Sequence, residues 1–235
     1  MCCDAHCCIE GTLAVSIRNT LLLAGGLLLA LGACTVPGGK YNQMMAERGV
    51  AGASRDSFTV CHGHGCRLRS EVTLTAQDWA PVAAIFDGPA ASAAAERQRI
   101  AEAIGVIEAS VALQAGTGAD RGGTLNAFSE TLGDSAAVDA QIDCVDETTN
   151  TSVYLTLLDQ AGYLKWHRID GWAGRGSLVV GTEWPHQSAV IVERQGGKAF
   201  AVDSWFEDNG HAAHVVPLAE WRAGWVPSGF TDSFF

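Results

Sequence analysis

Residues 143–162 read DCVDETTNTSVYLTLLDQAG. Acidic and hydroxyl residues open it, apolar residues in its second half recur at helical spacing, and Gly162 suits the end of a helix. The apolar stripe consists of Val153, Tyr154, Leu157, Leu158 and Ala161. The stretch therefore predicts a helix with Cys144 at its start.

The flanking segments predict further helices and an antiparallel hairpin. In residues 91–113 the residues Ile100, Ile104, Ile107 and Val111 repeat at helical spacing. Other expected elements are a helix at 125–132, strands at 164–169, 188–193 and 198–203, and a closing helix at 217–225. Helices followed by a hairpin favour an α+β domain in which helices pack on an antiparallel sheet.

The hairpin makes a prediction about two polar residues. A tight turn at residues 195–196 pairs Ser188 with Asp203. His186 then lies one diagonal step from Asp203 on the same face of the sheet, and a slightly wider turn would put the two directly opposite each other. Strand pairing of the opposite parity would put the two side chains on opposite faces.

Cys144, His186 and Asp203 together suit nucleophilic catalysis. A thiol reacts as thiolate, and a helix N-terminus favours negative charge. A reactive thiol also needs a base, and a third group must orient that base. The backbone N–H of Cys144 and the Gln141 side chain are candidate oxyanion donors. Each residue also has a purely structural interpretation, since a cysteine at a helix start is usually a small buried hydrophobe.

This arrangement resembles a known family. The tetrapeptide 143–146 opens a helix, His186 precedes a strand, and Asp203 ends the next. The order Cys, His, Asp is similar to that of bacterial transglutaminase-like cysteine proteinases, within the papain-like/transglutaminase-like superfamily. The resemblance spans about residues 141–205 and implies a papain-like/transglutaminase-like core, with Cys144 as nucleophile, His186 as base and acid, and Asp203 as the orienting group.

The same resemblance raises calcium as a possible cofactor and implies no other. Some members hold calcium with acidic residues beside the cysteine, and Asp143 and Asp146 match these positions. Val145 stands where such members carry a third carboxylate, so the expected calcium site at Asp143 and Asp146 is incomplete.

The N-terminal region is typical of an export signal. Arg18 precedes an apolar run at 20–31, and residues 31–34 (LGAC) resemble a bacterial lipobox. We expect residues 1–33 to be a signal peptide, with acylation such as palmitate on Cys34 and attachment to a membrane surface. An uncleaved anchor helix is the alternative. The Cys-rich residues 1–13 do not resemble a signal sequence, which favours true initiation near Val15 over a Cys/His metal knot.

Residues 34–57 are rich in Gly and Ala and predict a lipidated tether, followed by a hydrolase domain at 58–235. In an oxidising compartment Cys61 and Cys66 are expected to form a disulfide, which leaves Cys144 free. The competing interpretation is a metal site in the loop 61–66 (CHGHGC), with help from His211 and His214.

Composition narrows the function further. The formal net charge of −11 is spread along the chain and no basic patch is present, so nucleic acid is not an expected partner. We expect a lipid-anchored, periplasm-facing thiol hydrolase or acyltransferase of the bacterial cell envelope that acts on amide bonds of periplasmic protein or cell-wall peptide. Peptidase, amidase and transglutaminase chemistry all fit. The alternative is a non-catalytic binding or scaffold lipoprotein. Trp184, Trp205 and Trp221 fit a groove wall or the core.

Overall fold

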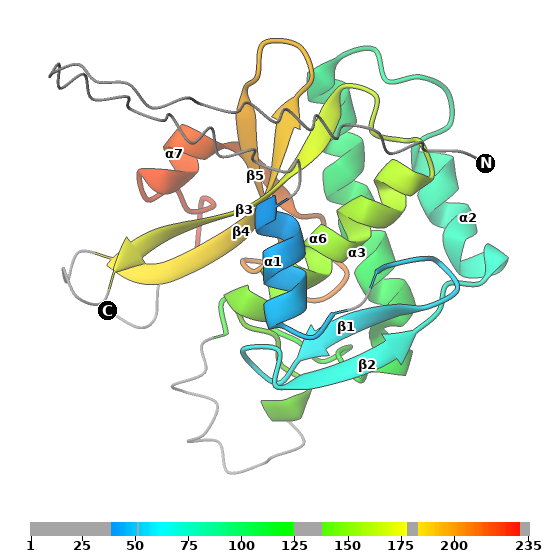
Figure 1. The fold of residues 1–235 in the computed structure, drawn as a ribbon, viewed down its shortest axis with the longest axis vertical. Helices are drawn as coiled ribbons and strands as arrows, with labels where there is room; N and C mark the ends of the chain where they lie inside the picture. Colours follow the sequence, from blue (N-terminus) through cyan, green and yellow to red (C-terminus); the bar gives the residue numbers. More distant parts are fainter. Residues whose placement is uncertain (1–38, 51, 125–137, 178–182, 231–235) are drawn as a thin grey trace, which may run out of the picture. The chain divides into compact units, whose positions relative to one another are not determined.

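The structure is a computed structural model that describes residues 39–50, 52–124, 138–177 and 183–230. Helix α6 (Cys144–Gln160) lies at the centre of this part of the chain (Figure 1). The elements are α1 (Gly39–Glu47), β1 (Phe58–His62), β2 (Leu68–Val72), α2 (Ala76–Ile85), α3 (Ala93–Ala115), α6, β3 (His167–Ser177), β4 (Glu183–Glu193), β5 (Ala199–Asp203), β6 (His214–Pro217) and α7 (Leu218–Arg222). The fold is mixed helix and antiparallel sheet, as the expected α+β class requires.

Helix α6 begins where the sequence predicts. The Asp143 carboxylate caps it by accepting the backbone N–H groups of Val145 at 2.9 Å and Asp146 at 3.0 Å. Asp146 reaches back to the N–H of Asp143 at 3.3 Å, which completes a capping box. Cys144 is therefore the first residue of a firmly capped helix.

Two antiparallel sheets surround α6. The larger has the strand order β3-β4-β5-β6, and the smaller is the hairpin β1-β2. In the β4-β5 pair Ala189 faces Val202 and Val192 faces Ala199. Extending this register pairs Ser188 with Asp203, which confirms the predicted hairpin. Strand β3 begins later and runs further than the predicted 164–169.

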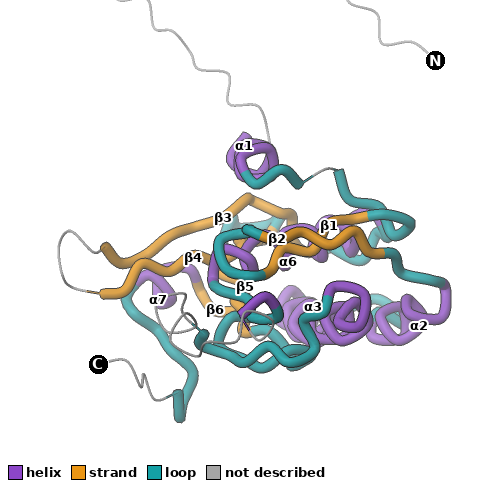
Figure 2. The backbone as a smooth tube through the Cα atoms, turned by 90° about the horizontal axis from the view of Figure 1, so that it is seen from below, coloured by secondary structure: helices purple, strands orange, loops and turns teal. Residues whose placement is uncertain are grey.

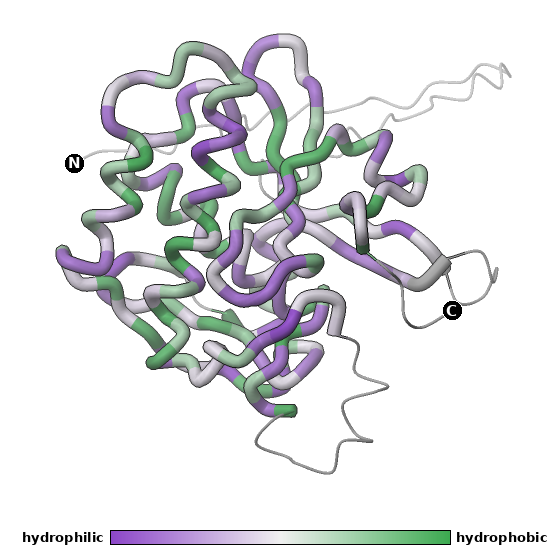
Figure 3. Tube along the Cα trace, turned by 180° about the vertical axis from the view of Figure 1, so that it is seen from behind, coloured by the Kyte–Doolittle hydropathy of each residue, from purple (hydrophilic) through white to green (hydrophobic). Residues whose placement is uncertain are grey.

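The two faces of the larger sheet bury different clusters. Ala189 and Ile191 join the main core with α6 and α3, whereas Val190 and Val192 pack with Trp221 of α7. Burying a side chain such as Leu158 contributes about 2 kcal/mol or more. In Figure 2, α1 lies on the opposite side of α6 from α2 and α3. Figure 3 shows apolar and polar residues alternating along the helical turns.

The prediction of a tether at residues 34–57 has to be corrected, because the described part of this segment belongs to the folded domain. Residues 39–47 form α1, and Met44, Met45 and Val50 are buried in the main core. These apolar positions are too few to give a clear helical period, and packing against α6 and β3 stabilises the helix. The domain therefore extends N-terminally beyond Phe58.

The signal peptide at 1–33, the lipidation site Cys34 and the expected helix at 125–132 lie outside the described residues. Within the residues that are described, none of the helices combines the length and the apolar character that crossing a membrane demands.

Candidate active site

His186 and Asp203 form a buried pair at the junction of β4 and β5. His186 Nε2 lies 2.7 Å from Asp203 Oδ2, and the two residues are 6% and 2% exposed. The pair lies on one face of the sheet, as the predicted register requires. Since Nε2 bonds the carboxylate, Nδ1 is the nitrogen that can exchange a proton with a thiol.

Three aromatic rings enclose the imidazole. The ring centroids of Trp205, Phe206 and Trp221 lie 4.7, 5.4 and 5.5 Å from that of His186. Trp221 also donates its indole N–H to Asp203 Oδ2 at 2.6 Å. Trp205 and Trp221 therefore belong to the site, although the sequence left them unassigned. The side chain of Trp184 lies outside the described residues.

The Cys144 thiol lies beside the same segment of β4. A hydrogen bond from the backbone of Gln187, the residue that follows His186, lowers the pKa of the thiol. Cys144 is 8% exposed and clusters with Trp205 and Phe206, the rings that contact the imidazole. Within the described residues no hydrogen bond joins the thiol to the imidazole, so the two groups are neighbours without a direct bond in this structure.

The electrostatics of the thiol differ from the expectation of a lowered pKa. Burial, followed by the negative charge of Asp143, raises the pKa of Cys144 to about 12, although the Gln187 N–H opposes the rise. The charges of Asp203 and Asp146 raise it further. The positive helix end is therefore outweighed by burial and by carboxylates, and the resting group is a neutral thiol.

The two expected oxyanion donors differ in their surroundings. Within the described residues the backbone N–H of Cys144 has no protein acceptor, whereas its neighbours Val145 and Asp146 donate to the cap. The Gln141 amide holds the loop 119–124: its oxygen accepts from Arg121 N and Thr124 Oγ1, each at 3.1 Å, and its nitrogen donates to Ala119 O at 3.0 Å. Cys144 N–H is the better-placed donor.

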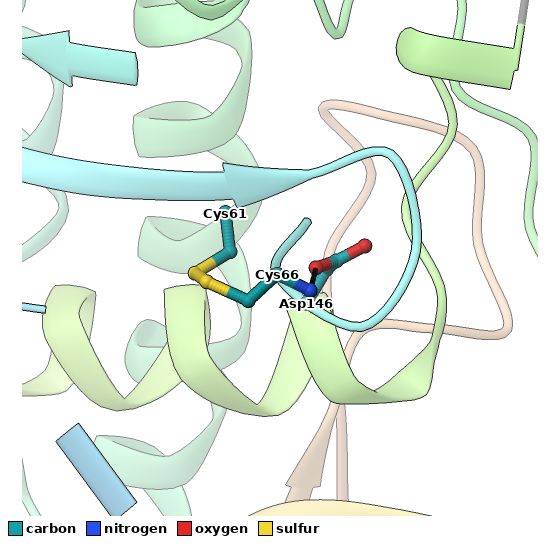
Figure 4. Close-up of side chains that lie close together, drawn as sticks. All are labelled: Cys61, Cys66 and Asp146. Atoms are coloured by element: carbon teal, nitrogen blue, oxygen red, sulfur yellow. Dashed lines mark hydrogen bonds between the residues drawn. A yellow bond between two sulfur atoms is a disulfide. The ribbon is translucent and has the colours of Figure 1, made fainter. Parts of the chain in front are cut away.

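The loop 61–66 grips the start of α6. Cys61 and Cys66 form the expected disulfide, with their Cα atoms 4.6 Å apart. The backbone N–H of Cys66 donates to Asp146 at 2.5 Å (Figure 4). The backbone N–H of His64 donates to the same carboxyl group at 2.9 Å. Residues 63–66 all have positive φ, and the N–H groups of this turn donate to two carboxyl groups, since His64 and Cys66 donate to Asp146 and Gly65 donates to Asp143. The loop thus surrounds carboxyl oxygens of the protein itself with N–H donors.

The two acidic residues of the expected calcium site are engaged by backbone donors. Both oxygens of Asp146 and both oxygens of Asp143 accept backbone N–H groups, including Gly65 N at 3.0 Å on Asp143. A calcium ion at this site would share these oxygens with the backbone donors, because calcium binds carboxylate and carbonyl oxygens directly.

The residues expected to bind a metal in the loop 61–66 are engaged in other interactions. Cys61, Cys66 and Asp146 have ligand atoms within 4.8 Å of one another, but the two sulfurs are bonded to each other. The His211 and His214 imidazoles bond Asp208 O and Glu207.

A group of buried carboxyl groups lies near the His186–Asp203 pair. Glu147 accepts the Ser204 hydroxyl at 2.5 Å, and Asp120 accepts the backbone N–H of Ile142 at 2.7 Å. Burial raises the pKa of Glu147 to about 7 and, together with the charge of Glu147, raises that of Asp120 to about 9. These groups carry protons at pH values where exposed carboxyls do not.

Comparison with known proteins identified no matching family model, no matching curated protein and no matching solved structure.

Proposed function

We propose that this chain is a thiol hydrolase or acyltransferase that acts on amide bonds through Cys144, His186 and Asp203. The observation that supports the proposal most strongly is the buried His186–Asp203 pair at 2.7 Å, near Cys144, which clusters with the Trp205 and Phe206 rings that contact the imidazole. These contacts join residues from a helix start and two strands, so the three residues that follow the order Cys, His, Asp along the chain also lie near one another. A transglutaminase-like core is part of the proposal.

The proposed reaction proceeds from the neutral thiol. As the sulfur attacks the amide carbonyl carbon, its proton passes to His186 Nδ1, and the Cys144 N–H binds the developing oxyanion. The C–N bond then breaks and the imidazolium proton goes to the leaving amine, which leaves a thioester. Water, or an acceptor amine, attacks the thioester, gives a proton to Nδ1 and releases the thiol in its protonated form.

The proposed setting is the periplasmic face of a bacterial cell envelope, with the domain anchored through a lipid on Cys34. The substrate class is an amide of periplasmic protein or cell-wall peptide. The burial of the site supports chemistry away from bulk water, because the charges that develop interact more strongly there.

Acylation by an activated ester tests the chemistry without a known substrate. With p-nitrophenyl acetate we expect one equivalent of p-nitrophenol in a burst and an acetyl group on Cys144, located by mass spectrometry. His186→Ala should slow the burst by about 10²-fold or more, because the thiol loses its base. Cys144→Ala should remove it while its thermal unfolding stays close to that of the wild type. Acylation that is equally fast in the His186→Ala variant would contradict the proposal.

One observation favours a second candidate, a non-catalytic binding or scaffold protein. Cys144 is buried and its pKa is raised to about 12, which suits a structural thiol. A wild-type chain whose cysteine stays unacylated in the ester experiment would favour this function.

A further inference from the structure

Arg48, one residue beyond the end of α1, connects the two halves of the candidate site. Its Nη1 donates to Val145 O at 3.0 Å and its Nη2 donates to Gln187 Oε1 at 2.7 Å. Nη1 also donates to Thr149 Oγ1, one turn further along α6. One guanidinium therefore holds the helix of the nucleophile and the strand of the base.

The two anchoring points are the immediate neighbours of the reacting residues. Val145 follows Cys144 in α6, and Gln187 follows His186 in β4. The backbone of Gln187 also lowers the pKa of the Cys144 thiol, so the held residue acts on the nucleophile itself. A planar guanidinium fixes two acceptors in one geometry, which a lysine ammonium does not do.

Arg48 is itself held in place on several sides. Its backbone carbonyl accepts Arg69 Nη1 at 3.2 Å, and the same Arg69 atom donates to Cys66 O at 3.1 Å. Met44 and Met45, in the preceding turn, are buried in the main core. The disulfide loop of Figure 4 thus supports Arg48 as well as Asp146.

The charge of Arg48 acts on the same site. Burial lowers the pKa of the guanidinium, and the nearby acidic groups of Asp143 and Asp146 oppose that fall. A positive charge here offsets part of the carboxylate field that keeps the thiol neutral.

We propose that Arg48 is a positioning residue that sets the geometry between the Cys144 thiol and the His186 imidazole by holding Val145 and Gln187. This inference rests on the proposed thiol chemistry and adds a residue from the segment that the sequence predicted to be a tether. The guanidinium contacts the neighbours of the reacting residues, so its effect on acylation acts through them.

The test is a double-mutant cycle with p-nitrophenyl acetate on the full chain. Arg48→Lys keeps the charge and loses the two-armed grip, and we expect the acylation burst to slow by about 10²-fold, the cost of a misplacement on the order of 1 Å. In a His186→Ala background the same substitution should change the rate less than about twofold, because the geometry it sets no longer matters. Arg48→Met also removes the charge and should move the pH profile of the burst to higher pH, whereas Arg48→Lys should keep its shape.

Arg97→Lys is the matched control. Arg97 lies in α3, away from the thiol, and is also largely buried. Its Nη1 is 2.6 Å from Glu193 Oε1. The control should keep the wild-type burst rate while losing thermal stability comparably to Arg48→Lys.

Each outcome of the cycle tests either the positioning role of Arg48 or the proposed function. An Arg48→Lys effect that is equally large with and without His186, or that is absent, overturns the positioning role. A wild-type burst that does not depend on His186 overturns the proposed function instead. If Arg48→Lys does not fold, Gln187→Ala, which removes one arm of the grip, should show the same dependence on His186, and an effect independent of His186 would overturn the proposal.

Discussion

At the scale of single residues, one oxygen atom organises the base. Asp203 Oδ2 accepts both His186 Nε2 and the Trp221 indole N–H, at 2.7 and 2.6 Å. Two donors on one oxygen fix the plane of the carboxylate and therefore the direction of the imidazole. Trp221 is fully buried, so water does not compete for this oxygen from the side that the indole covers.

Trp221→Phe should therefore slow acylation while the aromatic packing on His186 is kept. A hydrogen bond to a charged group is worth about 1.5–3 kcal/mol, which corresponds to a loss of about tenfold to 100-fold if the carboxylate loses its orientation. The burst rate with p-nitrophenyl acetate measures the effect. Trp205→Phe is the control, because its indole donates to Thr124 O at 3.0 Å and not to the carboxylate. Equal rates for Trp221→Phe and the wild type would show that the indole only fills space.

The sequence predicts the catalytic candidates but not the residues that hold them. Cys144, His186 and Asp203 have residue types with characteristic chemistry and lie near element ends. Arg48 and Gln187 are 139 residues apart, and their contact depends on how α1 docks on the sheet. Trp221 carries no local signal that separates a hydrogen-bond donor to a carboxylate from a core residue.

At the scale of elements, periodicity decides what could be predicted. Helices α3 and α6 and the β4-β5 hairpin have long apolar periods or a tight turn, and the structure confirms them. The smaller elements lack such signals. Strand β1 is buried at every position and does not alternate, and α2 contains Pro81. Their conformations depend on tertiary packing, which short sequence windows do not contain.

The disulfide loop is the element whose stabilising effect can be measured directly. We expect the double variant Cys61→Ala/Cys66→Ala to lower the free energy of unfolding by about 2 kcal/mol, because so short a loop gains limited entropy when it is opened. Urea denaturation followed by tryptophan fluorescence measures the change. Reduction of the wild type under denaturing conditions should bring its unfolding curve to that of the double variant. An unchanged midpoint would mean that hydrogen bonds to Asp146 hold the loop without the cross-link.

At the scale of the whole molecule, some of the acidic residues that give the chain its negative formal charge are buried in the interior. The chain carries a formal charge of −11, yet Glu108, Asp120, Asp146 and Glu147 are buried. Burial raises the pKa of Glu108, and it raises that of Asp146 to about 8 with help from Asp143. Several formal charges are thus neutralised by protons in the folded state near neutral pH. The same carboxyls ionise freely in the unfolded chain, which makes folding a proton-binding event.

The stability of the fold should consequently decrease as the pH rises from about 5 to about 9. Unfolded carboxyls titrate near pH 4, whereas folded Glu147 and Asp120 have pKa values of about 7 and about 9, so the folded state binds more protons across this interval. Their contribution to stability is complete at low pH and is lost as each folded group ionises. Urea midpoints at pH 5, 7 and 9 measure this dependence.

Asp120→Asn identifies one source of the dependence, since an asparagine oxygen still accepts the N–H of Ile142 without titrating. The variant should flatten the loss of stability between pH 7 and about 9. Asp78→Asn is the control: Asp78 is exposed and its pKa is lowered by the hydrogen bond from Thr75, so its ionisation is complete below this interval. A wild-type midpoint that is constant or rises toward pH 9 would mean that the buried carboxyls are ionised in the folded protein, and the Cys144 thiol would then face an even more negative environment.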